Sequence, residues 1–488
     1  MSMIQINHLS FTYPESYEPV FEDVCIQLDT DWKLGLIGRN GCGKTTLLKL
    51  LQGLYDYQGS IHASTTFDYF PSPVPSPNAL TMELAATLCP LAEEWQLRRE
   101  CQLLSINADD IFYRPFSTLS GGEQTKFLLA CLFLNNDHFL LIDEPTNHLD
   151  AHAREVVAAY LSRKKGFILV SHDRAFLDAC VDHILAINRH SIDIIAGNYS
   201  IWKEAHDNRE TFEKRQNKRL QKEIQHLQDA ASRTADWSDR VERSKIGAAD
   251  KGYVGHMAAK MMKRSKATLA RREKAIAEKS SLLKDHEIEQ PLKLTPLFPR
   301  VGTLLRIQNL QIIYDGQPIG APVSLTLRRG DRLFLDGPNG AGKSSLLALA
   351  SGQPLEHLGT CQLASGLIIS TVPQHTDHLH GDVITFARSH NVDLTLFLSF
   401  LRKMGFSRSH FEKEMAQFSE GQKKKVLLAK SLSESADLYI WDEPLNYIDL
   451  YSRLQIEKLI QTYQPTMLLV EHDRSFRDTI ATDVIALP

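Results

Sequence analysis

The sequence contains no stretch of about 18 consecutive apolar residues, the length that a helix needs to cross a membrane. Its start, Met1 to Ile6, also lacks the basic and then apolar pattern of a signal peptide. These two absences predict a cytoplasmic protein without a membrane span of its own.

Cysteine is sparse and shows no paired pattern. The 488 residues include seven cysteines, an odd number, and none of them forms a C-x-x-C pair. This pattern argues against a disulfide framework, a zinc site and an iron–sulfur cluster. We expect reduced thiols, most of them buried.

The chain also lacks a strong excess of charge of either sign, because its net charge is −4. The distribution is uneven, however. From Asp207 to Gln290 there are 20 Lys and Arg against 14 Asp and Glu, and between Arg240 and Lys274 the counts are 11 and 3. A local basic segment of this kind points to nucleic acid, although the total charge does not.

What the sequence does contain is a duplication, in a chain longer than one hydrophobic core usually supports. Gly38 to Thr45 and Gly337 to Ser344 both fit G-x-x-x-x-G-K-[ST], at an offset of 299 residues. Three further pairs follow in the same order, at offsets of 299, 299 and 300 residues: Ser120 and Ser419, Asp143-Glu144 and Asp442-Glu443, and His172 and His472. This recurrence indicates two copies of one domain.

Each motif lies beside a predicted strand. The glycine loops follow apolar runs and precede helix-like segments, which is the context that a phosphate-binding loop requires. The acidic pairs and the histidines follow further apolar runs, which are typical of buried parallel strands. Because ligand sites in open α/β sheets lie beyond the strand ends, we expect the motifs to converge.

The two loops predict two ATP sites, since backbone N–H groups of such a loop cradle phosphates and its lysine adds positive charge. A simple glycine-rich turn is the alternative for an isolated match. The residues expected to hold ATP are Gly38, Asn40, Gly41, Gly43, Lys44, Thr45 and Thr46, and Gly337, Asn339, Gly340, Gly342, Lys343, Ser344 and Ser345. Two tyrosines upstream of the loops can stack on adenine or belong to the core, namely Tyr13 and Tyr314.

Magnesium and water chemistry are expected beside each loop. The expected Mg²⁺ ligands are the hydroxyls and carboxylates of Thr45, Asp143, Ser344 and Asp442. The glutamates that follow the aspartates can polarise the attacking water, namely Glu144 and Glu443. The histidines that can hydrogen-bond a γ-phosphate are His172 and His472. Solvated turn residues are the alternative for an isolated acidic pair.

The segments Leu119-Ser120-Gly121-Gly122-Glu123-Gln124 and Phe418-Ser419-Glu420-Gly421-Gln422 resemble the ATP-binding-cassette signature, with two plain helix N-caps as the alternative. Together the motifs resemble those of the F subfamily of ATP-binding-cassette proteins, over essentially the whole chain. The resemblance implies an α/β fold with two tandem cassettes (P-loop NTPase domains) joined by a long antiparallel helical linker. The expected bounds are 1–203 for the first cassette, 204–300 for the linker and 301–488 for the second cassette.

In that superfamily the signature of one cassette closes over ATP held by the other. The resemblance therefore implies a monomer whose cassettes dimerise intramolecularly around two ATP molecules. One composite site, called here the Lys44 site, would combine Lys44, Thr45, Asp143, Glu144 and His172 with Ser419 and Gly421. The other, the Lys343 site, would combine Lys343, Ser344, Gln374, Asp442, Glu443 and His472 with Ser120, Gly121 and Gly122. Asp150 and Asp449 match the loop that communicates across this interface.

The sequence departs from the family pattern at three places, one of which is Glu123 in the position of the glutamine that usually follows the first signature. The second cassette has Val372-Pro373-Gln374, which offers the glutamine that senses magnesium, whereas the first reads Tyr69-Phe70-Pro71-Ser72. Glu420 replaces the first signature glycine of the second cassette. Only 46 residues separate Ser72 from Leu119, so no inserted arm is expected there.

Four segments resemble the ribosome-protection branch, which gives resistance to lincosamides, pleuromutilins and streptogramin A. They are Tyr69-Phe70-Pro71, Arg114-Pro115-Phe116, Trp441-Asp442-Glu443-Pro444-Leu445-Asn446-Tyr447-Ile448-Asp449 and Gly252-Tyr253-Val254-Gly255-His256. The partner that this resemblance implies is the bacterial ribosome, at its exit-site region, with 23S rRNA and tRNA. A housekeeping F-subfamily translation factor acting on stalled ribosomes is the runner-up. A transporter ATPase, which would need membrane partners, is a third alternative.

The predicted linker reads as a helical hairpin. Leu220, Ile224 and Leu227 fall at helical spacing, as do Leu269 and Ile276, and roughly 35 residues in each helix would span about 50 Å. Side chains near its turn are expected to contact rRNA phosphates and bases: Arg240, Arg243, Lys245, Lys251, Tyr253, Lys260, Lys263, Arg264 and Lys266. A solvated helix face is the alternative.

Overall fold

The computed structural model describes residues 3–14, 19–135, 138–147, 149–188, 191–243, 263, 271, 274, 293–297, 302–314, 316–338 and 340–487. The chain divides into two compact units, one formed by Met1–Trp202 with Pro291–Pro488 and the other by Lys203–Gln290. The first unit contains both copies of the duplicated motifs. We call residues 3–202 the first cassette and residues 293–487 the second cassette.

The main sheet of the first cassette has six strands in the order β5-β6-β7-β3-β8-β9. Their bounds are β3 (Lys33–Gly38), β5 (Thr66–Phe70), β6 (His138–Asp143), β7 (Phe167–Val170), β8 (His183–Ile187) and β9 (Ile192–Ala196). All neighbours are parallel except β8 and β9. Strand β7 is buried throughout, as a continuous apolar run between two covering layers should be.

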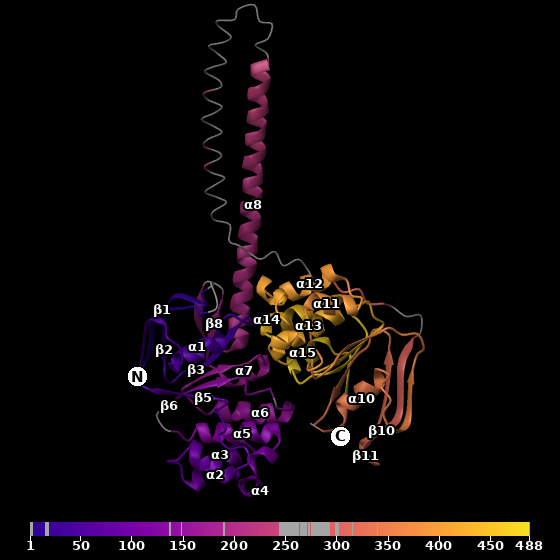
Figure 1. Cartoon of the computed structure of the whole chain (residues 1–488). Coiled ribbons are helices and arrows are strands. Elements are labelled where there is room, and N and C mark those ends of the chain that lie inside the picture. The colour runs from indigo at the N-terminus through magenta and orange to yellow at the C-terminus, as the bar shows by residue number, and fades with distance from the viewer. Residues whose placement is uncertain are drawn as a thin grey trace, which may run out of the picture. The chain divides into compact units, whose positions relative to one another are not determined.

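Helices and a second sheet cover the main sheet of the first cassette. The second sheet has the order β2-β1-β4, with β1 (Met3–Phe11), β2 (Phe21–Asp29) and β4 (Gln58–Ala63). The helices are α1 (Lys44–Leu51), α2 (Thr81–Leu88), α3 (Glu94–Leu103), α4 (Ala108–Phe112), η1 (Phe116–Thr118), α5 (Gly121–Leu132), α6 (Ala151–Leu161) and α7 (Arg174–Cys180). Helices α2, α3, α4 and α5 pack together around one apolar core, at one end of the cassette in Figure 1.

The second cassette repeats this arrangement. Its main sheet has the order β14-β15-β16-β12-β17, all parallel, and its small antiparallel sheet has the order β11-β10-β13. The strands are β10 (Thr303–Tyr314), β11 (Gln317–Arg328), β12 (Arg332–Asp336), β13 (His357–Leu363), β14 (Ile369–Val372), β15 (Leu438–Asp442), β16 (Met467–Val470) and β17 (Asp483–Ala486). The helices are α10 (Lys343–Ala350), α11 (Val383–Ser389), α12 (Leu394–Lys403), η2 (Arg408–Glu412), η3 (Met415–Gln417), α13 (Glu420–Ser433), α14 (Leu450–Tyr463) and α15 (Arg474–Ile480).

The two cassettes contact each other through charged and apolar side chains. Arg174 Nη1 donates to Glu457 Oε2 at 3.1 Å in a buried pair, and Arg474 pairs with Glu155 in a more exposed one. Leu450 of the second cassette packs into the core of the first. Arg174 begins α7 and Arg474 begins α15, and these helices follow His172 and His472. The interface therefore joins corresponding parts of the two copies.

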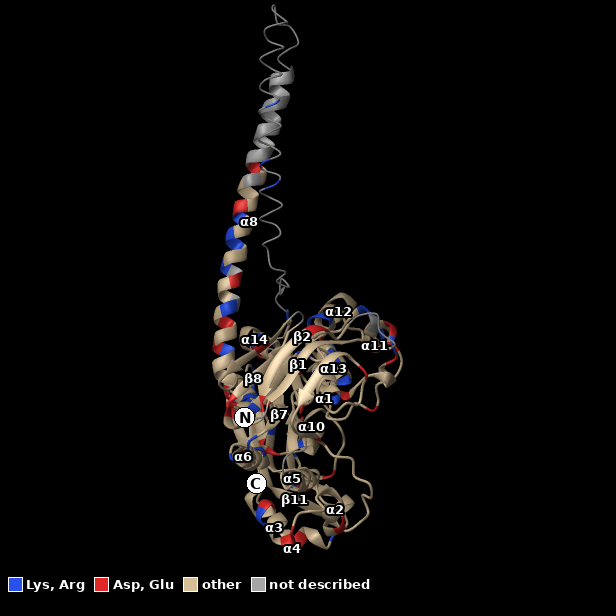
Figure 2. Cartoon of the chain, turned by 90° about the vertical axis from the view of Figure 1, so that its left-hand side faces the viewer, with Lys and Arg blue, Asp and Glu red and all other residues tan. Residues whose placement is uncertain are grey.

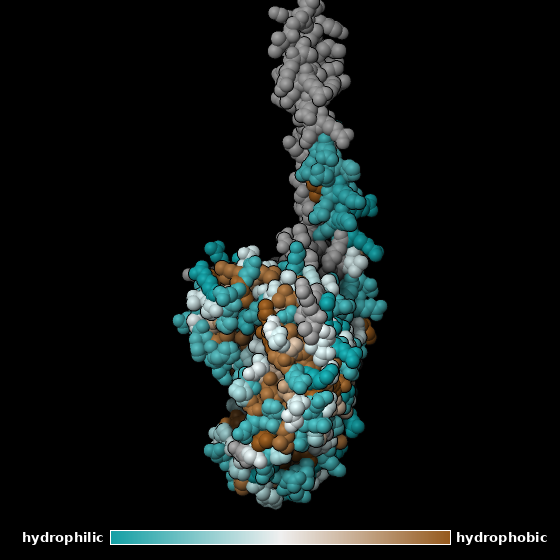
Figure 3. Space-filling view, turned by 90° about the vertical axis from the view of Figure 1, so that its right-hand side faces the viewer, coloured by the Kyte–Doolittle hydropathy of each residue, from teal (hydrophilic) through white to brown (hydrophobic). Residues whose placement is uncertain are grey.

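The second unit contains most of helix α8 (Tyr199–Arg243), whose 45 residues make it longer than the roughly 35 expected. Charges of both signs alternate along it (Figure 2), and its visible described face is mostly hydrophilic (Figure 3). Ile224 is buried, whereas Leu269 and Ile276 lie outside the described residues. Among the described helices, none combines the length with the apolar character that crossing a membrane requires.

Candidate ATP sites

The glycine loops lie between β3 and α1 and between β12 and α10. Gly43 and Gly342 precede the helices with φ of 98° and 83°, a left-handed conformation that side chains disfavour. Lys44 Nζ donates to the carbonyl oxygens of Gly38 at 2.9 Å and Arg39 at 3.1 Å, and Lys343 Nζ makes the same contacts with its own loop. These contacts shape two cradles that can take a phosphate chain. Asn339 lies outside the described residues.

The expected metal-binding residues meet in pairs. Thr45 Oγ1 donates to Asp143 Oδ2 at 2.9 Å, and the Ser344 hydroxyl acts on the corresponding Asp442, where it lowers the pKa of the carboxyl. Asp442 Oδ1 is buried without a protein partner, and burial raises the pKa of this carboxyl. Hydroxyl and carboxylate oxygens beside a phosphate cradle are the donor set that Mg²⁺ prefers, so these residues fit the ion.

Each catalytic candidate lies beside its histidine. His172 Nε2 is 3.3 Å from Glu144 Oε1, and His472 Nε2 is 3.4 Å from Glu443 Oε1. Both glutamates have a left-handed backbone, with φ of 50° and 45°, immediately after their strands end. A non-glycine residue in this conformation at the same place in both copies is typical of a functional position.

The two glutamates have different electrostatic surroundings. Burial raises the pKa of Glu144 to about 8, and the neighbouring Asp143 adds to this rise. Burial acts in the same direction on Glu443, but hydrogen bonds from His472 and Gln374 outweigh it and lower the pKa of Glu443 to about 2. The two sites therefore differ chemically although their motifs match.

Tyr69 is a site residue that the motif analysis did not assign. Its hydroxyl donates to Asp143 Oδ2 at 2.9 Å, the oxygen that also accepts from Thr45. In the second cassette no tyrosine occupies this position, and Gln374 is instead one of the groups that lower the pKa of Glu443. The sequence signal for Tyr69 was its place in the segment Tyr69-Phe70-Pro71, which stands where the second cassette has Val372-Pro373-Gln374.

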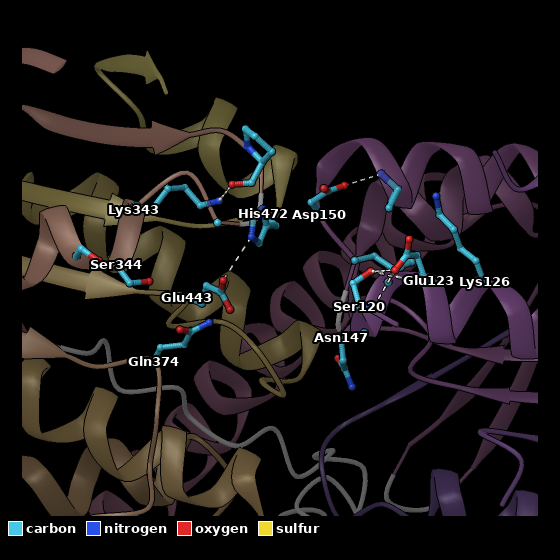
Figure 4. A pocket seen from close by; sticks show the side chains of 18 of the residues that line it. Ser120, Glu123, Lys126, Asn147, Asp150, Lys343, Ser344, Gln374, Glu443 and His472 are labelled. Atoms are coloured by element: carbon cyan, nitrogen blue, oxygen red, sulfur yellow. Dashed lines mark hydrogen bonds and ion pairs between the residues drawn. The ribbon is translucent and has the colours of Figure 1, made fainter. Parts of the chain in front are cut away.

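A cavity of about 740 Å³ at the Lys343 site is lined by residues of both cassettes. In Figure 4, Lys343, Ser344, Gln374, Glu443 and His472 line one side, and Ser120, Glu123, Lys126, Asn147 and Asp150 line the other. Gly121 and Gly122 also line it. The residues expected across this composite site therefore face one cavity, except Asp442, which does not line it. Lys126 and Asn147 are additional polar groups in its wall.

The Lys44 site also receives the signature of the other cassette. Asn40 Nδ2 donates to the carbonyl oxygen of Tyr447 at 3.0 Å, and a Cβ added to Gly421 would lie 3.6 Å from Asn40 Nδ2. Ser120 and Ser419 each cap their helix by accepting from a backbone N–H at 3.3 Å. Ser120 thus combines the N-cap role with a position in the wall of the Lys343 cavity.

The two candidate adenine-stacking tyrosines differ in exposure. Tyr13 packs edge-on against Phe11, with ring centroids 4.9 Å apart, and its hydroxyl lies 2.8 Å from Thr46 Oγ1. Tyr314 is 46% exposed, lines the Lys343 cavity and lies 2.7 Å from Ser345 Oγ. Tyr314 thus has the more accessible ring.

Most of the candidate RNA-binding side chains cannot be placed. Lys263 is described and exposed. Arg240 and Arg243 belong to α8, but their side chains lie outside the described part, as do the residues Lys245, Lys251, Tyr253, Lys260, Arg264 and Lys266. The RNA-binding assignment therefore remains a prediction.

A His–Asp–Cys group lies elsewhere, on β1 and β2. His8 Nδ1 is 2.6 Å from Asp23 Oδ1, and the backbone N–H of His8 donates to Cys25 Sγ at 3.2 Å. In the second cassette the backbone N–H of Asn309 donates to Ser324 Oγ in the same way. The contact from a backbone N–H to the facing side chain thus occurs in both cassettes and belongs to the pairing of the two strands. All seven cysteines are free thiols, and four of them are buried.

A family model described as ABC transporter matches residues 21–147 and 321–446, which together make up more than half of the chain and carry both glycine loops and acidic pairs. The chain belongs to the ATP-binding-cassette family. The predictions that this ABC protein folds as two tandem α/β cassettes and that it is an ATPase are thereby confirmed. Domains of this family bind ATP.

Known proteins resemble this ABC ATPase along most of its length. It is 26% identical to the Ribosome protection protein VmlR of Bacillus subtilis (strain 168), over 95% of this chain and 83% of that protein. It is 26% identical to the Energy-dependent translational throttle protein EttA of Escherichia coli O6:H1, over 96% and 89%. These relatives support the F-subfamily resemblance that the motifs indicate.

In solved structures, the ABC ATPase resembles an archaeal ribosome recycling factor, aABCE1, in its complex with the ribosomal stalk protein aP1. The TM-score is 0.63 at 19% identity, over 98% of this chain and 87% of that chain. An RNase-L Inhibitor matches with a TM-score of 0.58 at 19% identity, over 93% and 83%. At this identity the likeness shows the fold of the two cassettes.

Proposed function

We propose that this ABC ATPase is an F-subfamily ribosome protection factor, which binds the bacterial ribosome and dislodges lincosamides, pleuromutilins and streptogramin A from the peptidyl-transferase centre. The observation that carries this proposal is the similarity to VmlR, which covers 95% of this chain and so includes the segment between the cassettes. The location that this function requires is the cytoplasm, with the chain acting as a monomer.

We further propose specific roles for the site residues. Glu144 and Glu443 polarise the attacking water, supported by their position directly after Asp143 and Asp442. Their histidine neighbours hold the γ-phosphate. Thr45, Ser344 and the two aspartates hold Mg²⁺, which neutralises phosphate charge when bound. Gln374 is the proposed magnesium sensor of the Lys343 site alone.

The segment between the cassettes is the proposed RNA-binding part. Its support is the excess of 11 basic over 3 acidic residues between Arg240 and Lys274. Lys and Arg neutralise backbone phosphates and supply most of the affinity in such contacts, in a salt-dependent manner. Ribosomal RNA near the exit site is the proposed target.

A second candidate is a housekeeping translation factor, which the equal identity to EttA favours. Expression in a drug-sensitive bacterial host separates the two. A protection factor raises the inhibitory concentrations of the three drug classes severalfold, but not that of a drug acting on the small ribosomal subunit. The Glu144→Gln/Glu443→Gln variant, expressed equally, removes this gain. Unchanged inhibitory concentrations together with ATP-dependent co-sedimentation with ribosomes would favour the housekeeping factor. Absence of co-sedimentation would contradict both candidate functions.

A further inference from the structure

The signature helix of the second cassette, α13, carries two side chains that its counterpart α5 lacks. Lys424 and Glu420 occupy the positions that Thr125 and Gly121 hold in α5, at the offset of 299 residues. Glu420 is also the departure from the signature pattern. Both side chains contact the segment after β14, which we call the Gln374 loop (residues 373–376).

Lys424 binds the Gln374 loop from inside the protein. It is 2% exposed, and its Nζ donates to the carbonyl oxygens of Pro373 at 2.7 Å, Gln374 at 2.9 Å and Asp442 at 3.3 Å. An ammonium group has three N–H donors, so all are used. Thr125 has one hydroxyl on a short side chain and cannot make this set of contacts in the first cassette.

Glu420 makes a second contact with the same loop. Its Oε2 accepts from Thr376 Oγ1 at 2.5 Å, and its Oε1 accepts from Lys423 at 3.0 Å. In the first cassette the corresponding residues are Gly121 and Val74, which offer neither an acceptor nor a hydroxyl. The first turn of α13 is therefore held to the Gln374 loop by side chains that have no equivalent in α5.

These contacts join parts of different ATP sites. Gln374 and Asp442 belong to the Lys343 site, and Gln374 lines its cavity (Figure 4). The start of α13 lies close to the Lys44 loop, because a Cβ added to Gly421 would be 3.6 Å from Asn40 Nδ2, and Asn40 itself donates to the carbonyl oxygen of Tyr447. A shift of the Gln374 loop on nucleotide binding would therefore move the signature that serves the Lys44 site.

We propose that Lys424 and Glu420 couple the two ATP sites, so that ATP bound at the Lys343 site strengthens ATP binding at the Lys44 site through α13. This inference rests on the composite sites proposed above. Coupling of affinities is reciprocal, so ATP at the Lys44 site strengthens binding at the Lys343 site by the same factor. The two cassettes nevertheless differ in their part in this coupling, because α13 of the second cassette transmits it and α5 of the first cassette does not.

The test measures this coupling on the purified full-length chain carrying Glu144→Gln/Glu443→Gln, with fluorescent ATP labelled on its ribose. Lys343→Ala removes one site, and the coupling factor is the loss of affinity that this change causes at the Lys44 site. We expect a loss of about fivefold or more in the parent, a size typical of allosteric coupling. With Lys424→Thr/Glu420→Gly, which install the residues of α5, we expect a loss below twofold.

Two controls accompany the test. Lys430→Thr makes the same exchange on α13 at a lysine that pairs with Glu434, away from the Gln374 loop, and should leave the coupling factor at its parent value. Glu420→Gly alone changes an exposed side chain, so it keeps the test valid if loss of the buried Lys424 prevents folding. It should lower the coupling factor partly.

The outcomes are distinct. An equal loss of affinity in the parent and in Lys424→Thr/Glu420→Gly, or no loss in the parent, would overturn the coupling proposal. Lys44→Ala should weaken the Lys343 site by the parent factor, and unequal factors would also contradict it. Because no ribosome is present, these results are independent of the drug-protection test, and failure of ATP to bind at all would instead refute the proposed function.

Discussion

At the residue scale, the two ATP sites hold their acidic side chains differently. Tyr69 and Thr45 both donate to Asp143 Oδ2 in the first cassette, whereas Asp442 Oδ1 has no protein partner in the second. Asp143 is a proposed Mg²⁺ ligand, and a phenol hydroxyl that donates to such a carboxylate fixes its orientation, as outer ligands of metal sites do. The first cassette thus has a positioning residue where the glutamine is missing.

Tyr69→Phe should therefore weaken magnesium-dependent ATP binding at the Lys44 site. Removing one hydrogen bond to a charged group costs about 1.5–3 kcal/mol, so we expect affinity to fall about 10-fold or more. The measurement is ATP binding against Mg²⁺ concentration in a Lys343→Ala background, with binding in EDTA unchanged. The matched control is Thr371→Ala in a Lys44→Ala background, since Thr371 holds the same register position and should show no effect.

Glu144→Gln/Glu443→Gln should abolish most hydrolysis while preserving ATP binding. Each amide keeps the shape of the side chain but cannot accept the proton of the attacking water, and loss of a general base typically costs about 100-fold or more. Phosphate release and nucleotide binding are measured on the same preparation, and the closed form should accumulate on ribosomes. Turnover at the parent rate would refute the assignment.

At the scale of elements, a buried ion pair joins α13 to the start of α14. Lys425 Nζ lies 2.7 Å from Asp449 Oδ2, and both side chains are almost fully buried. Asp449 also caps α14 by accepting from the backbone N–H of Ser452. The corresponding residues of the first cassette, Lys126 and Asp150, instead line the open Lys343 cavity.

Asp449→Asn should destabilise the protein because it keeps the cap but leaves Lys425 without its buried partner. Losing one member of a buried pair typically costs about 3–5 kcal/mol, whereas Asp150→Asn, at a carboxylate that lines the cavity, should cost less than about 1 kcal/mol. Despite burial, Lys425 holds the pKa of Asp449 below its ordinary value of 3.8. The ionised Asp449 therefore makes its full contribution to the unfolding free energy at neutral pH. This contribution is lost as the pH falls below 3.8 and through the lower pKa of the folded state.

Urea unfolding at several pH values checks this expectation. The difference in unfolding free energy between the parent and Asp449→Asn should be largest at neutral pH and should shrink in acid. A difference that stays constant with pH would show that the Asp449 charge does not stabilise the fold.

At the scale of the whole molecule, we expect each ATP site to depend on the signature of the other cassette. Ser120→Ala should slow hydrolysis about 10-fold in a Glu144→Gln background, where only the Lys343 site turns over, because one hydrogen bond to a phosphate is lost. The same change in a Glu443→Gln background should have little effect. Ser419→Ala should show the reverse pattern, and equal effects in both backgrounds would contradict the composite arrangement.

The segment between the cassettes should be separable from ATP hydrolysis. Replacing residues 245–255 with a short Gly/Ser turn should preserve ATPase activity and much of the ribosome binding, while abolishing drug protection. Reversing the charges of Lys260, Lys263 and Arg264 should instead weaken ribosome binding and flatten its dependence on salt. Full protection by the shortened protein would show that the cassettes alone carry the function.

The sequence alone predicted the two cassettes and the core of each ATP site. The glycine loops, the pairs Asp143-Glu144 and Asp442-Glu443 and the two histidines lie just beyond or at the ends of buried strands. A short motif specifies its own strand, loop and helix, because these depend on hydrophobic pattern and backbone conformation within a few residues. Parallel strands then bring their ends together at one edge of the sheet, so convergence also followed from the pattern.

The tertiary structure decided what differs between the two sites. The contact of Tyr69 with Asp143 joins residues 74 positions apart, and that of Lys424 with Pro373 joins residues 51 apart. Glu144 and Glu443 have similar motifs, yet burial raises the pKa of one to about 8, whereas hydrogen bonds lower that of the other to about 2. Desolvation and hydrogen bonding depend on everything packed around a group, and only the folded chain determines those neighbours.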